Sequence, residues 1–250
     1  MPIRLGQHFL INKEVSIKIV EAAGIFSSET VLEIGPGKGI LTEQLAERAK
    51  KVIAIEKDYN LAAQLEGRWE NVEIVMGDAL EVEWPPFDKI VANIPYEISS
   101  PLLERIFELR KPVVLMLQKE FAARLIGKPG TKEYSRLSIA AQYFCEIKKV
   151  LDVKRGAFRP MPKVDSTVVK ILPKEPPFPT DEYFWEVVTK LFQHKKRTIR
   201  AAVKSAHLYD HRDANAIPLH LPERFEKKRI VQCTLEELKE LVNLLREHMH

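Results

Sequence analysis

Apolar, strand-like segments alternate with amphipathic helical patterns through the first two thirds of the chain, and this alternation constrains the fold most. The strand-like segments are apolar almost throughout, which is typical of strands buried on both faces of a parallel sheet. The sequence therefore predicts an α/β fold with helices covering both sides of the sheet. The predicted strands are 30–34, 51–55, 72–75, 87–93, 112–118, a segment within 137–153, and 166–172. The predicted helices between them are 13–23, 41–49, 59–68, 101–109 and 119–125.

A proline-rich segment, residues 173–179, is the best candidate for a domain boundary. The patterns beyond it are helical, and Thr234 with Glu237 forms a capping-box sequence that predicts the start of the last helix. The basic run 194–200 is also predicted to be helical. We therefore expect an α/β domain over residues 1–175 and a small helical domain over residues 176–250.

Charge is unevenly distributed along the chain, although the net charge is only +4. Residues 1–118 carry 13 Lys and Arg against 18 Asp and Glu, whereas residues 119–170 carry 12 against 5. An acidic first half joined to a basic middle is typical of an enzyme that binds a polyanion. This distribution disfavours an enzyme that acts only on small molecules.

Cysteine and hydropathy patterns exclude several classes of protein. Cys145 and Cys233 are too few for a disulfide framework or a cysteine metal cluster, and the histidines are scattered, so no metal site is predicted. No apolar run approaches the roughly 18 residues of a membrane span, and the N-terminal residues lack the pattern of a signal peptide. We expect a cytoplasmic protein without membrane association.

A glycine-rich segment, residues 33–39, follows a predicted strand and precedes a predicted helix. Its spacing is G-x-G-x-G, which differs from both the dinucleotide-binding pattern and the P-loop. Pro36 also removes an N–H group that a pyrophosphate would use. We expect Gly35 to let the backbone approach a ligand closely and Glu33 to organise the loop.

Acidic residues end the next two predicted strands. Glu56 follows the second strand, where a carboxylate can accept hydrogen bonds from ribose hydroxyls, and Asp78 could accept one from the adenine amine. The carboxyl ends of parallel strands meet at one edge of a sheet, so these residues should share a site with Gly35. Together they predict an adenosine cofactor bound without a phosphate clamp, which fits S-adenosylmethionine.

The tetrapeptide Asn93-Ile94-Pro95-Tyr96 ends the fourth predicted strand and suits a flat heterocycle that carries an amino group. The Asn93 carboxamide oxygen can accept a hydrogen bond from the amine, and Pro95 fixes φ so that the Ile94 carbonyl can do the same. Tyr96 can then stack on one face of the ring, with Phe158 on the other. A base held in this way must first leave its stack.

Six motifs together carry a family resemblance: Gly6–Leu10, 33–39, Glu56, 77–80, 93–96 and 158–166. Several occur throughout class I methyltransferases, whereas the first and the last are specific to one family. On these motifs the chain resembles the rRNA adenine dimethyltransferases over nearly its whole length. The resemblance implies a class I methyltransferase Rossmann-like sheet with a small C-terminal all-helical domain. It places cofactor contacts at His8, Leu10, Gly35, Glu56, Asp78 and Asn93.

The resemblance also implies a substrate, namely two adjacent adenosines in a hairpin loop near the 3′ end of small-subunit rRNA. Their exocyclic amines would be dimethylated, within a pre-assembled ribosomal small subunit, by a monomeric enzyme that contributes to ribosome biogenesis. Residues 1–175 would bind the cofactor and residues 176–250 the RNA. Basic residues are the candidates for phosphate contacts, and Lys196 and Arg200 would share one helix face. These candidates are Lys128, Lys132, Arg155, Arg159, Lys195, Lys196, Arg197 and Arg200.

Two other functions remain open on the same fold. One is a large-subunit rRNA adenine methyltransferase of the macrolide-resistance type, which would share the cofactor and base sites. The other is a non-catalytic ribosome-assembly factor, against which the presence of Glu56, Asn93 and Tyr96 argues.

Overall fold

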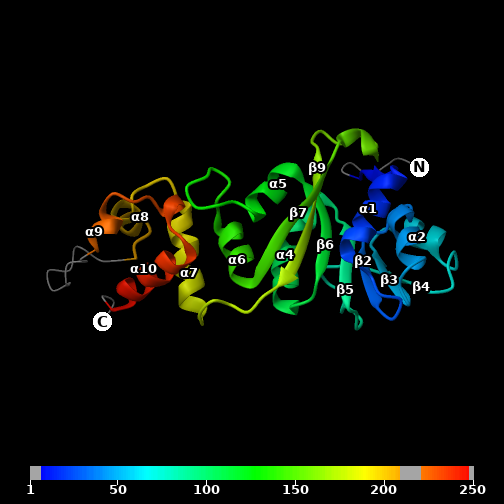
Figure 1. The fold of residues 1–250 in the computed structure, drawn as a ribbon, viewed down its shortest axis with the longest axis horizontal. Coiled ribbons are helices and arrows are strands. Elements are labelled where there is room, and N and C mark those ends of the chain that lie inside the picture. The colour runs from blue at the N-terminus through cyan, green and yellow to red at the C-terminus, as the bar shows by residue number, and fades with distance from the viewer. Residues whose placement is uncertain (1–6, 209–220, 248–250) are drawn as a thin grey trace. The chain divides into compact units, whose positions relative to one another are not determined.

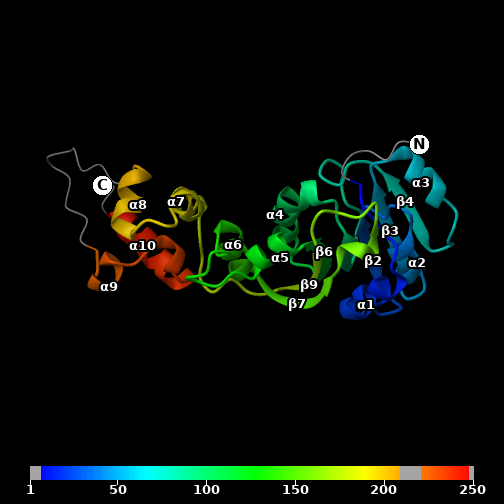
Figure 2. The ribbon, with the colours of Figure 1, turned by 90° about the horizontal axis from the view of Figure 1, so that it is seen from above.

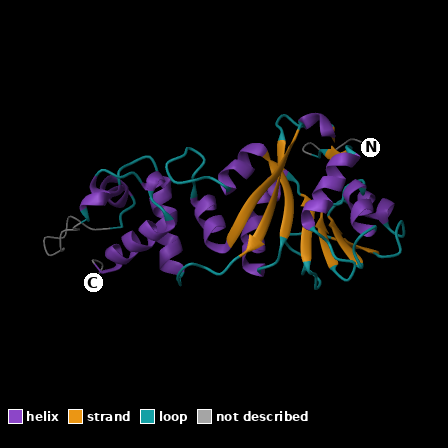
Figure 3. Cartoon of the chain, viewed as in Figure 1, coloured by secondary structure: helices purple, strands orange, loops and turns teal. Residues whose placement is uncertain are grey.

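A computed structural model describes residues 7–208 and 221–247, and the chain forms two compact units (Figure 1). The first unit comprises residues 1–122 and 145–174, and the second comprises residues 123–144 and 175–250. Within the described residues the named strands all belong to the first unit, whereas the second is helical (Figure 3). No described helix is both long enough and apolar enough to cross a membrane.

A seven-stranded mixed sheet forms the centre of the first unit, in the order β4-β3-β2-β5-β6-β9-β7. The strands from β4 to β6 run parallel, so their carboxyl ends lie along one edge, as the sequence predicts. The last two positions differ from the all-parallel expectation, because β9 runs antiparallel to both β6 and β7. The strands are β2 (Thr30–Ile34), β3 (Lys51–Glu56), β4 (Val72–Met76), β5 (Lys89–Asn93), β6 (Val113–Gln118), β7 (Cys145–Val153) and β9 (Ser166–Pro173).

Both faces of this sheet are buried. Val31, Val52 and Val91 pack in one core cluster with residues of α1 and α2. Their neighbours along the strands, such as Leu32 and Ile53, point to the opposite face and are also fully buried, so helices cover that face too. Figure 2 shows α1 and α4 on opposite sides of the sheet. The helices of this region are α1 (Lys13–Ala23), α2 (Ile40–Ala46), α3 (Tyr59–Leu65), α4 (Ser99–Leu109) and α5 (Lys119–Leu125).

Two short strands join segments that are about 150 residues apart in the sequence. β1 (Phe9–Leu10) pairs antiparallel with β8 (Phe158–Arg159), and Leu10 lies opposite Phe158. The Ile11 N–H extends this pairing with a 2.8 Å hydrogen bond to the Ala157 carbonyl. Two motifs that carry the family resemblance are therefore neighbours in space, although Gly6 lies outside the described residues.

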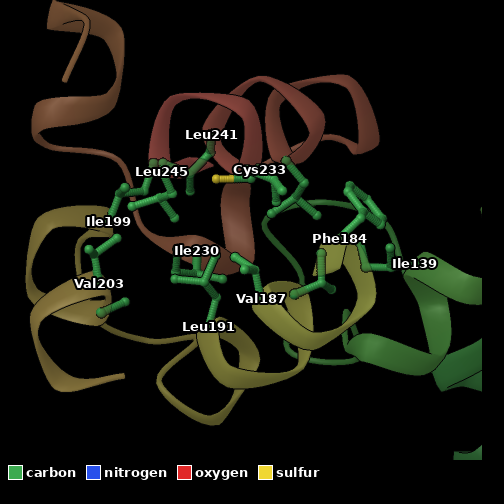
Figure 4. Close-up of a cluster of buried hydrophobic side chains, with 14 of the residues drawn as sticks. Ile139, Phe184, Val187, Leu191, Ile199, Val203, Ile230, Cys233, Leu241 and Leu245 are labelled. Atoms are coloured by element: carbon green, nitrogen blue, oxygen red, sulfur yellow. The ribbon is translucent and has the colours of Figure 1, made fainter. Parts of the chain in front are cut away.

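The second unit has its own hydrophobic core (Figure 4), which explains why it includes residues 123–144. Tyr134 and Tyr143 from this segment are buried, and their hydroxyls donate to the Cys233 and Phe178 carbonyls at 2.9 and 2.6 Å. Residues 123–144, which the sequence boundary at 175 placed in the α/β domain, thus pack with the C-terminal helices. These are α6 (Arg136–Phe144), α7 (Glu182–Gln193), α8 (Ile199–Ser205), α9 (Glu223–Glu226) and α10 (Leu235–Glu247).

Helix starts in the second unit follow their capping residues. The capping box that opens α10 is present, since the Thr234 N–H donates to Glu237 at 2.8 Å and the Glu237 N–H donates to Thr234 at 3.3 Å. The predicted helix over residues 194–200 is wrong. Thr198 caps α8, and the residues before it form a turn that bonds to residues 230–231, so that the Val231 N–H donates to the Lys195 carbonyl. Lys196 and Arg200 therefore do not share a helix face.

Candidate functional site

A cavity of about 470 Å³ opens at the carboxyl ends of β2, β3 and β5, within the first unit. This is the edge at which open α/β sheets bind their ligands. The sequence-predicted residues that line it are His8, Leu10, Gly35, Glu56, Asp78, Asn93, Ile94, Pro95 and Tyr96. Among the described residues, no group of three or more His, Cys, Asp or Glu could hold a metal ion.

The glycine loop after β2 turns tightly against its neighbours. Gly35 and Gly37 have φ values of +70° and +59°, which favour glycine. A Cβ on Gly37 would lie 3.0 Å from the Phe9 ring. A Cβ on Gly35 would lie 3.4 Å from the Pro95 side chain, so both glycines let the loop pack closely against neighbouring side chains while it lines the cavity.

Glu56 holds this loop in place. Its side chain is buried at the end of β3, and its two carboxylate oxygens accept hydrogen bonds from the Gly37 N–H at 3.1 Å and the Asp58 N–H at 2.8 Å. The sequence predicts that Glu33 organises the loop, whereas in the structure the hydrogen bond to the Gly37 N–H is accepted by Glu56. Glu56 lies at the cavity wall, where its remaining acceptor capacity can face a ribose.

Glu33 has a different environment. It is 1% exposed, it lines the cavity, and its Oε2 atom has no hydrogen-bond partner among the described residues. Burial raises the pKa of Glu33 to about 8; the Thr42 side chain opposes this rise and the Glu56 carboxylate adds to it. Glu33 therefore binds a proton at neutral pH and can act as a neutral polar group in the cavity wall.

Burial of Glu33 should make the stability of the protein pH-dependent. The folded state binds this proton more tightly than the unfolded state, so the contribution to stability is present below about pH 4.5 and is lost up to about pH 8. Glu33→Gln should remove the loss, which is about 1.4 kcal/mol per pH unit in that window. Denaturant unfolding at pH 5 to 8.5 measures it. Glu73→Gln, an exposed carboxylate, is the control, and identical pH profiles for Glu33→Gln and wild type would contradict the prediction.

Asp78 follows β4 and is also held by neighbours. One carboxylate oxygen accepts from Lys57 Nζ at 2.5 Å and the other from the Leu80 N–H at 2.9 Å. The hydrogen bond from Lys57, followed by that from Leu80, lowers the pKa of Asp78. Asp78 is therefore an ionised acceptor in the cavity wall. Lys57 was missed in the sequence, although it directly follows Glu56.

The tetrapeptide after β5 brings an amide, a buried backbone and an aromatic ring to one wall of the cavity. Asn93 is the last residue of β5, Ile94 is 1% exposed, and Pro95 has φ −57° and ψ 133°. The Tyr96 hydroxyl lies 2.8 Å from the hydroxyl of Ser166, the first residue of β9. Burial raises the pKa of Tyr96, and the Ser166 hydrogen bond opposes the rise. Ser166 thus fixes the ring. In the sequence, Ser166 is recognised only as the last residue of the motif 158–166, and its contact with Tyr96 is not predicted.

The other predicted base-stacking residue, Phe158, lies elsewhere. Its side chain is 3% exposed and packs in the core cluster with Leu10, and it is not among the residues that line the cavity. His8 lies near Tyr96, with 6.3 Å between the ring centroids, and its Nδ1 atom is 2.8 Å from the Pro160 carbonyl oxygen. In this structure the Phe158 ring therefore packs in the core and holds β8 against it.

The predicted phosphate contacts fall in both units. Arg155 and Arg159 are exposed in the first unit, and Lys128, Lys132, Lys196, Arg197 and Arg200 are exposed in the second. Lys195 differs, because its ammonium group donates to the Lys132 and Tyr134 carbonyls at 3.0 and 2.6 Å. Burial, followed by the positive charges of Arg124 and Lys196, lowers the pKa of Lys195. Lys195 therefore holds the loop that carries Lys132.

The fold and the cavity define an α/β methyltransferase, and comparison with known proteins supports this class. The description "Ribosomal RNA adenine dimethylase" belongs to the family whose profile matches residues 2–245. A probable ribosomal RNA small subunit methyltransferase A from Pyrococcus abyssi is 44% identical over 250 residues, which cover 98% of this chain and 92% of that protein. The corresponding Methanosarcina mazei protein is 44% identical over 246 residues, with 96% and 91% coverage.

Two solved structures match nearly the whole chain. A dimethyladenosine transferase from Plasmodium falciparum has a TM-score of 0.82 and 35% identity, and the match covers 96% of this chain and 98% of that one. The 23S rRNA methyltransferase ErmE has a TM-score of 0.71 and 30% identity, with 95% and 99% coverage. The chain belongs to the ribosomal RNA adenine dimethylase family. Membership of a methyltransferase family implies the use of S-adenosylmethionine.

Proposed function

We propose that the protein dimethylates the exocyclic amines of two adjacent adenosines in a hairpin loop near the 3′ end of small-subunit rRNA. The observation that carries this proposal is the 44% identity, over nearly the full chain, to proteins described as small-subunit rRNA methyltransferases. The large-subunit alternative has weaker support, since ErmE is 30% identical. The catalytic tetrapeptide at the cavity wall favours an enzyme over a non-catalytic assembly factor.

The residues of the cavity fit S-adenosylmethionine. The Gly35–Gly37 turn lines the cavity, Glu56 offers acceptor capacity to a ribose, and Asp78 is an ionised acceptor for the adenine amine. His8, Leu10 and Asn93 complete the wall. When bound, the cofactor supplies a methyl group on a positively charged sulfur.

The chain's own residues prepare the substrate amine. The lone pair of that amine is delocalised into the adenine ring, which makes it a poor nucleophile. The Asn93 side-chain oxygen and the Ile94 carbonyl accept hydrogen bonds from its two N–H groups, so that the lone pair localises and points away from the ring plane. Tyr96, fixed by Ser166, stacks on the base and excludes water. The rate enhancement then comes mainly from positioning and electrostatics.

The basic residues of both units supply the remaining contacts. Arg155 and Arg159 in the first unit and Lys128, Lys132, Lys196, Arg197 and Arg200 in the second are proposed to bind phosphates. Within the second unit, Lys195 contributes by positioning the loop of Lys132. The substrate is proposed to be the pre-assembled small subunit and the enzyme a cytoplasmic monomer.

Glu56→Ala should weaken S-adenosylmethionine binding by about 1–3 kcal/mol, because charged hydrogen bonds to the ribose are lost and the glycine loop loses its anchor. Isothermal titration calorimetry measures the effect. Glu73→Ala, which removes an exposed carboxylate from the neighbouring strand, is the matched control. Unchanged affinity in Glu56→Ala would refute the ribose assignment.

Mapping methylated adenines tests the proposed function as a whole. Small subunits from a strain that lacks the enzyme should gain dimethyladenosine at two adjacent positions when the protein and S-adenosylmethionine are added. Large-subunit RNA from the same strain should gain none. Methylation of the large-subunit RNA alone would favour the alternative, and methylation of neither would favour an assembly factor.

A further inference from the structure

Two large apolar side chains are exposed on the segment that joins β8 to β9. Met161 is 59% exposed and Val164 is 44% exposed, although Pro162 between them is buried. Exposed apolar groups of this size commonly mark a contact surface when they are grouped. Met161 and Val164 are called the apolar pair below.

Both ends of this segment are attached to residues that line the cavity. At the start, the Pro160 carbonyl oxygen lies 2.8 Å from Nδ1 of His8. At the end, the Ser166 hydroxyl lies 2.8 Å from the hydroxyl of Tyr96. The apolar pair therefore lies between two anchors that contact the wall of the base site.

The segment is also held by Asp165. Its carboxylate accepts hydrogen bonds from the Arg155 N–H at 3.0 Å and from Lys154 Nζ at 3.1 Å, and its carbonyl accepts one from the Lys119 N–H at 3.0 Å. The apolar pair is thus exposed on a segment that hydrogen bonds hold in place. A pre-organised surface loses little entropy when it binds a partner.

The segment that carries the apolar pair is positively charged. Residues 154–165 contain Lys154, Arg155, Arg159 and Lys163 against the single carboxylate of Asp165, which Lys154 pairs. An apolar centre with cationic neighbours matches a nucleic acid, in which bases contact the apolar groups and phosphates contact the cations. Two side chains are too small a surface for a stable protein partner.

We propose that Met161 and Val164 form a wedge that enters the RNA base stack beside the target adenine and fills the space that this base vacates. The inference rests on the proposed function, in which the adenine must leave its stack to reach Asn93. Apolar side chains inserted between bases are a common means of unstacking, and the proteins that use them surround the wedge with basic residues. The wedge would lower the cost of extrusion and add nothing to cofactor binding.

The double variant Met161→Ser/Val164→Ser tests the wedge, because both side chains are exposed and the substitutions spare the core. An RNA hairpin with 2-aminopurine at the target position reports unstacking by its fluorescence. We expect the fluorescence increase on binding to fall about fivefold or more, and single-turnover methylation of the unlabelled hairpin to fall about tenfold. Cofactor affinity by calorimetry should stay within about twofold. Val150→Ser, at a side chain that is 37% exposed on β7, should match wild type.

A substrate that is already unstacked distinguishes the loss of the wedge from a general structural defect of the variant. On an RNA with an abasic site beside the target adenine, the double variant should recover to within about threefold of wild type, and Met161→Leu/Val164→Ile should be active on both RNAs. Equal losses on both RNAs, or no loss on the hairpin, would overturn the proposal. The wild-type rate on the small-subunit hairpin tests the proposed function separately. If wild type methylates a large-subunit hairpin instead, the wedge is tested on that RNA by the same comparison of variant and wild-type rates, with and without the abasic site.

Discussion

Replacement of Asn93 by alanine is expected to lower the single-turnover rate of methyl transfer about 10²–10³-fold, with RNA and cofactor affinities little changed. Asn93 ends β5 at the cavity wall, and the next residue, Ile94, is buried. Its hydrogen bond strengthens as the amine nitrogen becomes tetrahedral, so the loss falls on the transition state. Rapid-quench measurement at saturating RNA and S-adenosylmethionine isolates this step.

Asn60→Ala is a matched control for Asn93→Ala, because Asn60 is exposed on α3. It should methylate RNA at the wild-type rate. A near-wild-type single-turnover rate in Asn93→Ala would show that another group accepts from the amine. A large loss of RNA affinity in Asn93→Ala would instead assign the residue to ground-state binding.

Reversal of Lys196, Arg197 and Arg200 to glutamate is expected to weaken RNA binding about a hundredfold near physiological salt. The three side chains are exposed in the second unit, and each lost phosphate contact should reduce the slope of log affinity against log salt by about 0.7–0.9. The slope should therefore fall by about two to three. Fluorescence anisotropy across a salt series measures both quantities, and calorimetry should show unchanged S-adenosylmethionine affinity.

The control for this triple variant reverses Lys13, Lys18 and Lys50, which are exposed in the first unit. The change in net charge is the same, so a general electrostatic effect would weaken both variants equally. Circular dichroism checks folding, since Arg197 donates a hydrogen bond to the Ser205 hydroxyl. An unchanged slope in the first variant would leave these cations as a solvated surface without a partner.

The cofactor side of the cavity was predictable from the sequence because strand ends fix it. Gly35, Glu56, Asp78 and Asn93 each follow an apolar segment, and the parallel strands bring those ends to one edge. The roles within the site were less predictable. Which carboxylate holds the glycine loop depends on the three-dimensional position of Gly37 relative to Glu56, and local sequence does not contain that information.

Elsewhere the structure differs from the sequence-based expectations, and these differences have a common cause in long-range contacts. Residues 194–200 have helical composition, but Thr198 and pairing with residues 228–231 break the helix. Residues 123–144 join the second unit because their tyrosines reach carbonyl groups far away in the sequence. Phe158 precedes a proline turn in the sequence, yet pairing with Leu10 places it in the core. Local propensity is a weak guide where tertiary contacts of this kind decide.

The position of β9 has a consequence for how the enzyme is made. β9 is among the last residues of the first unit to be synthesised, yet it lies between β6 and β7 and begins with the serine that holds Tyr96. A nascent chain that stops before Ser166 therefore leaves two strands with open edges, which invites mispairing with other chains. The base site matures only when β9 inserts, so partial translation products should lack activity and depend on chaperones.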